Sequence, residues 1–341
     1  MKNQITARDH VLDDFELPLG ATFHPLGFSL EIATNSEELL EGARESWDRF
    51  RRRFSAPPVH LRIMVLDGGP EECPEAPLIR VQHNFLTNVA SAENFTVCDM
   101  RQGTGFGWLT KAVVRNRAYL RYYFLEAAAW CLLHPPYLAN IHAACVSLDG
   151  KGVLLCGDSG AGKSTLAYAC ARSGWTFLSD DVSCLVRGRR GRVVVGNPHG
   201  MRFRETAVGL FPELKNQRVT PRATGELAIE LETASLPGIA TTSESRVDYV
   251  VFLNRAPGAQ ARFRPFPKEK AFQWFGQSIV YGEADVRAAQ KESMRELLKA
   301  QVVELRYSDL EAAIEELESL VRDTRSVYRK SSMTSAVQDN A

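Results

Sequence analysis

A glycine-rich segment around residue 160 has the residue types and spacing that bind phosphate. Residues 157–164, Gly-Asp-Ser-Gly-Ala-Gly-Lys-Ser, match the pattern G-x-x-x-x-G-K-[ST] at every fixed position. The apolar run 152–156 before them predicts a buried strand, and residues 165–172 after them are rich in helix formers. A strand, a glycine loop and a helix in this order direct backbone N–H groups at phosphate oxygens. This context favours a phosphate-binding loop over a glycine-rich turn that binds nothing.

The pattern assigns an expected role to each residue of the loop. The backbone is expected to surround the β-phosphate of a nucleotide, and Lys163 is expected to reach the β- and γ-phosphate oxygens. The hydroxyl of Ser164 is the expected Mg²⁺ ligand, and Thr165 is expected near the α-phosphate. The expected cofactors are therefore ATP and Mg²⁺. The residues expected to bind the nucleotide are Gly157, Asp158, Ser159, Gly160, Ala161, Gly162, Lys163, Ser164 and Thr165.

Two adjacent carboxylates follow the next predicted strand. Residues 174–178 are mostly apolar, and Ser179, Asp180 and Asp181 come directly after them. In an α/β sheet, the carboxyl end of a strand is where catalytic groups are presented. Neighbouring side chains on a strand point to opposite faces, so the two acids are expected to differ in role. We expect Asp180 to be the base toward an acceptor hydroxyl and Asp181 the Mg²⁺ partner; the reverse order and a simple turn cap are the alternatives.

A histidine is expected at the mouth of the glycine loop. Residues 142–148 predict a strand, and Asp149-Gly150 is a strong signal for a two-residue hairpin turn. If the turn has two residues, Leu148 lies opposite Lys151, and the same register places His142 opposite Gly157. The alternative is a core histidine whose nitrogens bond to the backbone.

Length and charge restrict the class of protein. The chain has 341 residues, enough for about two domains. Lys plus Arg and Asp plus Glu are equal at 41 each, so no overall field favours nucleic acid or a membrane as partner. Neither a membrane-length apolar run nor a signal-peptide core is visible, so a cytoplasmic protein is expected. We expect an N-terminal α/β domain of unknown role over 1–130, a second domain with the phosphate-binding loop (P-loop) over 131–323 and a disordered tail over 324–341.

Other segments predict secondary structure. Helices are expected from Ser36 to the Pro57-Pro58 pair, over 111–134 with an end at Pro135, over 284–299, and from a capping box at 308–311 to about 322. Strands are expected at 60–66, 78–81, 95–98, 183–186, 192–195, 249–253 and 302–306, and a turn-rich mobile insertion at 215–246. The segment 196–204, with Arg202 and Arg204, is interpreted as either an anion-binding loop or an ordinary surface loop.

The region from about Pro135 to Asp181 resembles the catalytic domain of the HPr kinase/phosphorylase family. That family phosphorylates serine in a bacterial carrier protein, and its relatives act on other serine acceptors, including peptide precursors. The resemblance lies in His142 and its distance from the loop, in the Gly157-Asp-Ser-Gly form of the loop, and in the strand that ends at Asp180 and Asp181.

The resemblance implies an α/β HPr-kinase/PEP-carboxykinase-like catalytic domain, preceded here by a smaller α/β domain. It implies ATP-dependent phosphorylation of a serine or threonine hydroxyl on a small protein or peptide, and a homo-oligomer. Asp180, His142 and Lys163 are the catalytic residues it implies, with His142 orienting Asp180 or the γ-phosphate. A kinase of a free small-molecule hydroxyl such as serine, and a non-catalytic nucleotide-gated binding module, are the competing interpretations.

Overall fold

The computed structural model describes residues 16–188, 191–221, 225, 227–279 and 282–322. Contacts within the chain divide it into two units: the first contains the residues up to Pro136 together with Gly282 and Glu283, and the second contains the other described residues from Tyr137 onward. Both units combine strands with helices, so the protein is of the mixed α/β class. The tail expected at 324–341 lies outside the described residues. Across the described residues, no helix combines the length and the apolar character that a membrane crossing requires.

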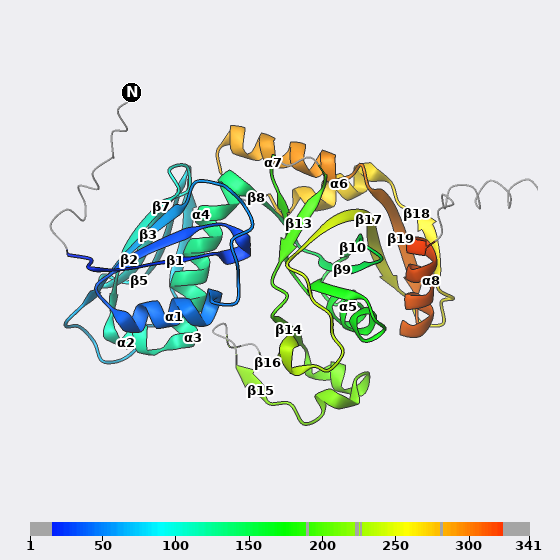
Figure 1. The fold of residues 1–341 in the computed structure, drawn as a ribbon, viewed down its shortest axis with the longest axis horizontal. Helices are drawn as coiled ribbons and strands as arrows, with labels where there is room; N and C mark the ends of the chain where they lie inside the picture. The colour runs from blue at the N-terminus through cyan, green and yellow to red at the C-terminus, as the bar shows by residue number, and fades with distance from the viewer. Residues whose placement is uncertain (1–15, 189–190, 222–224, 226, 280–281, 323–341) are drawn as a thin grey trace, which may run out of the picture. The chain divides into compact units, whose positions relative to one another are not determined.

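The N-terminal unit is built around a seven-stranded sheet of order β1-β2-β3-β7-β6-β5-β4 (Figure 1). Strand β3 alternates strictly between buried and half-buried residues, which is typical of a sheet with one covered face. Helix α1 contacts β1 and β2, and helix α2 contacts β3 and β7. The elements are β1 Leu19–Phe23, β2 Leu30–Thr34, α1 Glu37–Trp47, β3 Val59–Leu66, β4 Leu78–Gln82, β5 Phe85–Ser91, β6 Asn94–Asp99, β7 Thr104–Thr110, α2 Lys111–Arg115, α3 Arg117–Tyr119, a π-helix Leu120–Glu126 and α4 Ala127–Tyr137.

The first helix begins where the sequence predicts and ends earlier. The hydroxyl of Ser36 accepts the backbone N–H of Leu39 at 3.3 Å and caps α1. The helix ends at Trp47, so the prediction that it continues past Phe54 was wrong. The ring of Phe54 instead stacks on Phe28, with 4.5 Å between ring centroids. The helical spacing between Trp47 and Phe54 is coincidental, because packing against Phe28 determines the position of Phe54.

The second predicted helix is interrupted and slightly longer than expected. It consists of α2, α3, the π-helix and α4 in succession. Pro135 and Pro136 lie inside the last turn of α4, which ends at Tyr137. The expectation that Pro135 ends the helix was therefore wrong by about one half-turn.

The C-terminal unit contains a nine-stranded sheet. Its main path is β11-β9-β10-β17-β13-β12-β8, and β19 pairs with both β17 and β18. The strands are β8 Leu138–Ile141, β9 Ala144–Leu148, β10 Lys151–Cys156, β11 Thr176–Ser179, β12 Ser183–Val186, β13 Val193–Gly196, β17 Glu244–Arg255, β18 Arg262–Pro265 and β19 Gln301–Tyr307. Strand β17 is parallel to β10 and β19, and β9 is antiparallel to both β10 and β11. Strands β10, β11, β17 and β19 therefore point the same way and end at one edge of the sheet.

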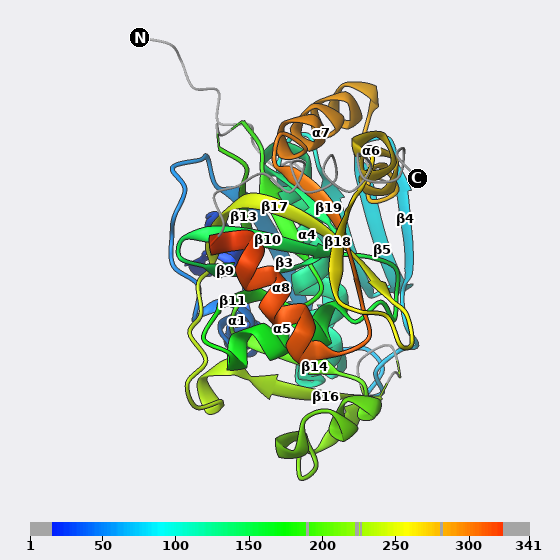
Figure 2. The same cartoon turned by 90° about the vertical axis from the view of Figure 1, so that its right-hand side faces the viewer.

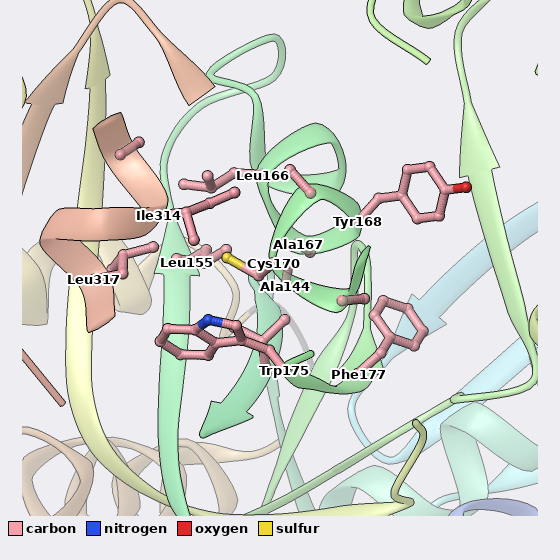
Figure 3. Close-up of a cluster of buried hydrophobic side chains, with 14 of the residues drawn as sticks. Ala144, Leu155, Leu166, Ala167, Tyr168, Cys170, Trp175, Phe177, Ile314 and Leu317 are labelled. Atoms are coloured by element: carbon pink, nitrogen blue, oxygen red, sulfur yellow. The ribbon is translucent and has the colours of Figure 1, made fainter. Parts of the chain in front are cut away.

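Helices cover both faces of this sheet. Helices α5 (Lys163–Arg172) and α8 (Leu310–Arg322) pack on one face, and α6 (Lys268–Gly276) and α7 (Ala284–Leu297) pack on the other. Figure 2 shows α5 and α8 lying side by side on their face. Figure 3 shows Ile314 and Leu317 of α8 directed toward Leu155 and Leu166, with Trp175 completing the core beside Cys170. This packing fixes the start of α5 against the end of β10.

The hairpin between β9 and β10 has the predicted register. Leu148 lies opposite Lys151, and the pairing continues to Ala144 opposite Leu155. Asp149 and Gly150 have φ angles of 50° and 75°, the two positive values that a type I′ turn requires. The start of β9 is therefore brought to the edge where β10 ends.

A small three-stranded sheet corrects one prediction. Its order is β14-β16-β15, with β14 Gly200–Phe203, β15 Val219–Pro221 and β16 Leu227–Glu232. Residues 215–246 were expected to form a mobile insertion, but they supply β15, β16 and the beginning of β17.

The capping of α8 also differs from the prediction. Asp309 accepts the backbone N–H of Ala312 at 2.9 Å, while the hydroxyl of Ser308 donates to the carbonyl oxygen of Ala259.

Candidate functional site

The glycine loop joins β10 to α5 and requires glycine at its ends. Gly157 has a φ of 148°, and a Cβ atom there would lie 2.8 Å from the Cβ of Ala161. Gly162, with a φ of 95°, is the N-cap of α5, and no side chain caps that helix. The backbone N–H groups of the first turn have no partner within a helix, so an uncapped start is suited to an anion.

Lys163 is held inside the loop by neutral groups. Its side chain is buried, and Nζ donates to the carbonyl oxygens of Gly157 at 2.8 Å and Asp158 at 3.3 Å. Burial lowers the pKa of Lys163, and the negative charge of Asp181 opposes that shift. A phosphate would stabilise this buried ammonium group more than the neutral carbonyls do, because the charge of an anion would offset the cost of desolvating the lysine.

The turn that carries the two aspartates is tied to the start of β9 by two buried hydroxyl groups. The hydroxyls of Ser179 and Ser183, on either side of the aspartates, bond to each other at 2.7 Å. Ser183 also donates to the carbonyl oxygen of Ala143 at 3.0 Å. Because Ala143 directly follows His142, this short network holds the imidazole beside the acidic turn.

The two adjacent carboxylates have different surroundings. Asp181 Oδ1 lies 3.3 Å from His142 Nδ1, and both side chains are about half exposed. Asp180 is half-buried, and its Oδ2 accepts the backbone N–H of Arg202 at 2.7 Å. Burial raises the pKa of Asp180 to about 6, the Arg202 N–H opposes the shift, and the charge of Asp181 adds to it. His142 thus contacts Asp181 rather than Asp180, and Asp180 is an acid that titrates near neutral pH.

The other residues of the glycine loop differ in their exposure to solvent. Ser164 and Thr165 occupy the first turn of α5 and are half-buried, and Asp158, Ser159 and Gly160 are exposed. The hydroxyl of Ser164 donates to the backbone carbonyl oxygen of Asp180 at 3.1 Å. This bond joins the glycine loop to the acidic turn.

The donor set suits a magnesium ion that bridges protein and phosphate. Mg²⁺ prefers oxygen ligands and is usually bound by one or two protein groups together with phosphate oxygens and water. The hydroxyl of Ser164 and the carboxylate of Asp181 are two of the oxygen donors beside Lys163. These residues therefore fit the metal that the sequence predicts.

Three side chains from distant parts of the chain touch the loop and were not among the predicted site residues. Arg204 Nη2 donates to the hydroxyl of Ser159 at 3.1 Å. The indole N–H of Trp274 donates to Asp158 Oδ1 at 3.4 Å, and the hydroxyl of Tyr307 donates to the carbonyl oxygen of Ala161 at 3.4 Å. Of these three residues, only Arg204 had a signal in the sequence, through the arginine-containing segment 196–204. Trp274 and Tyr307 reach the loop through the packing of α6 and the position of β19.

Comparisons with known proteins give a sparse result. No protein-family model matches the sequence. No curated protein matches it either. Among solved structures, the HPr(Ser) kinase/phosphatase from Coxiella burnetii is similar over 57% of this chain and 98% of its own, with 16% sequence identity and a TM-score of 0.30.

Proposed function

We propose that this protein transfers the terminal phosphoryl group of ATP, with Mg²⁺, to a serine or threonine hydroxyl of a small protein or peptide. The observation that carries the proposal is the meeting of three groups at one sheet edge. They are the buried Lys163 in an uncapped glycine loop, Asp180 with its raised pKa, and the His142–Asp181 pair. The resemblance of residues 135–181 to HPr kinases supports a hydroxyl group on a protein or peptide as the acceptor.

The chemistry required of the protein is mainly positioning and charge neutralisation. ATP with Mg²⁺ supplies the transferable phosphoryl group. Lys163 and the start of α5 would hold phosphate oxygens, and Ser164 and Asp181 would supply oxygen ligands to Mg²⁺. Asp180 accepts the proton of the acceptor hydroxyl. At the same time the hydroxyl oxygen bonds to the γ-phosphorus, and the bond between that phosphorus and the leaving ADP breaks. A carboxylate with a pKa of about 6 is ionised at neutral pH and is a stronger base than an ordinary aspartate.

His142 is a positioning residue in this proposal. Its Nδ1 faces Asp181, and Ser183 fixes the backbone next to it. The imidazole thereby holds the carboxylate of Asp181 in position, and Asp180 is held separately by the backbone N–H of Arg202. The reverse assignment, with Asp181 as base, is distinguished by the variants below.

The test is transfer of labelled phosphate from [γ-³²P]ATP with Mg²⁺ to a pool of serine- and threonine-containing peptides. Asp180→Asn is expected to retain nucleotide binding and to lose transfer by roughly 10²–10⁴-fold, the usual contribution of a general base. Asp181→Asn is expected to raise the Mg²⁺ concentration needed for activity. Asp149→Asn, at the turn on the opposite edge of the sheet, is the matched control for the loss of one carboxylate.

Each outcome is informative. Unchanged transfer by Asp180→Asn would remove that residue from the mechanism, and loss of all transfer in Asp181→Asn at every Mg²⁺ concentration would reverse the two roles. Label in free serine but not in peptides would indicate a small-molecule kinase. Tight ATP binding without product from any acceptor would indicate a nucleotide-gated binding module.

A further inference from the structure

Arg202 in β14 and Arg204, directly after the end of that strand, have different partners. The backbone of Arg204 is still extended and the two arginines are two residues apart, so alternation places their side chains on the same side. Arg202 lies opposite Glu230 in the β14–β16 pairing, and its Nε is 2.9 Å from Glu230 Oε1. The pairing ends one residue later, at Phe203 opposite Ile229, so Arg204 has no residue across from it. The charge of Arg202 is compensated within the small sheet, and that of Arg204 is not.

Arg204 turns toward the glycine loop instead. Its guanidinium donates to the hydroxyl of Ser159, and within the described residues it forms no ion pair with a carboxylate. Its positive charge contributes to the lowered pKa of Lys163, so the two cations repel each other at one loop. Repulsion between Lys163 and Arg204 destabilises the folded protein, and an anion bound between them would neutralise both charges.

The position of Arg204 along the loop identifies the end of the nucleotide that it faces. Nζ of Lys163 rests on the carbonyls of Gly157 and Asp158, at the beginning of the loop. The lysine of this motif reaches the β- and γ-phosphates, whereas the first helical turn, with Ser164, lies beside the metal and the inner phosphates. Ser159 follows Asp158 directly, so the guanidinium bonded to it lies on the γ-phosphate side.

The same strand also positions Asp180. The backbone N–H of Arg202 holds Oδ2 of Asp180 at 2.7 Å, and Arg204 is only two residues farther along. Strand β14 therefore holds Asp180 through its backbone and leads directly into the arginine that reaches the glycine loop. A terminal phosphate would face Arg204, and an acceptor hydroxyl would face Asp180.

We infer that Arg204 binds the terminal phosphate of the nucleoside triphosphate and so makes the site distinguish ATP from ADP. This inference rests on the proposed function. A guanidinium presents a planar set of donors that matches two phosphate oxygens at once, which an ammonium group does not. An arginine supplied within the same chain also neutralises charge on the transferred group and accelerates phosphoryl transfer.

The experiment is equilibrium binding of Mg²⁺ complexes of fluorescent ATP and ADP to the wild-type protein and variants. Wild type is expected to bind ATP more tightly than ADP. Arg204→Ala is expected to weaken ATP binding by about tenfold or more, as the loss of a charged hydrogen bond predicts, and to leave ADP binding unchanged. Arg204→Lys is expected to recover part of the preference for ATP, because it keeps the charge without the planar donors.

Arg322→Ala is the matched control, because this exposed arginine pairs with Asp149 and Glu318 near the opposite edge of the sheet. Thermal melts of all variants establish that each is folded. Equal weakening of ATP and ADP by Arg204→Ala, or no weakening of either, would overturn the inference and leave nucleotide binding in place. If the wild type binds neither nucleotide, the proposed function fails and the role of Arg204 fails with it.

Discussion

The hydroxyl oxygen of Tyr307 lies 2.8 Å from the position that a Cβ atom would occupy on Gly162. Tyr307 ends β19 and is fully buried, so its ring cannot move aside easily. Tyr307, the last residue of β19, thereby restricts the glycine loop that follows β10. Gly162 is required both by its positive φ and by this contact.

Gly162→Ala is expected to destabilise the protein. The positive φ alone costs an alanine about 1–2 kcal/mol, and the contact with Tyr307 adds to that cost. Gly174 offers a matched control, because its φ of 90° is close to the 95° of Gly162 but nothing lies within 4 Å of its Cβ position. Chemical denaturation should show a smaller loss for Gly174→Ala than for Gly162→Ala. Equal losses would show that Tyr307 does not restrict the loop.

Lys163→Met is expected to weaken nucleotide binding without lowering the free energy of unfolding. A lost charged hydrogen bond to phosphate contributes about 1.5–3 kcal/mol, so nucleotide affinity should fall at least tenfold. The free energy of unfolding should stay the same or rise, because a buried ammonium group that forms no ion pair within the described residues is replaced by an apolar chain of similar length. Isothermal titration calorimetry and urea denaturation measure the two quantities. A clear loss of stability would show that the two carbonyl bonds of Lys163 hold the loop together.

The rate of phosphoryl transfer is expected to rise with pH through about 6. Asp180 must be ionised to accept a proton, and burial raises its pKa to about 6. A plot of kcat/KM against pH should therefore show a single ascending limb in the acidic range that disappears in Asp180→Asn. An ascending limb that persists in the variant would assign the titration to another group.

The raised pKa of Asp180 also predicts that the stability of the protein falls with rising pH, whereas the transfer rate rises. In the folded protein Asp180 binds its proton more tightly than an ordinary aspartate, whose pKa is 3.8, so this group lowers the free energy of unfolding as pH rises from about 4 to about 6. Asp180→Asn removes that penalty. The variant should therefore gain stability relative to wild type across this window and keep the gain at neutral pH. Thermal melts at pH 4, 5, 6 and 7 test this, and a constant difference across the series would contradict it.

Trp274 is expected to report nucleotide binding. Its indole N–H bonds to Asp158 at the start of the loop, and its side chain is half-buried. Addition of ATP with Mg²⁺ changes the charge beside this indole, so tryptophan emission should change. Trp274→Phe should abolish the response, whereas Trp175, which is fully buried in the core of Figure 3, contributes a constant background. A full response in Trp274→Phe would locate the signal elsewhere.

Features that depend on short stretches of chain were predictable. The register between Leu148 and Lys151 follows from the Asp149-Gly150 turn, because two positive φ angles leave one way to pair the strands. Ser36 caps the first helix because its hydroxyl oxygen and the backbone N–H that it accepts, from Leu39, are only three residues apart. Predictions failed where a distant partner decided the outcome, as with Phe54, whose ring stacks on Phe28 instead of extending the helix.

The sequence by itself determined the glycine loop, the acidic pair and the histidine, because each depends on residue types in a contiguous pattern. Only the tertiary structure decided that His142 contacts Asp181, that the backbone of Arg202 holds Asp180, and that Arg204 reaches the loop. The order of strands in the sheet and the ending of the β14–β16 pairing at Phe203 create these contacts. Spacing along the chain does not encode them, because the segments involved meet only when the sheets form.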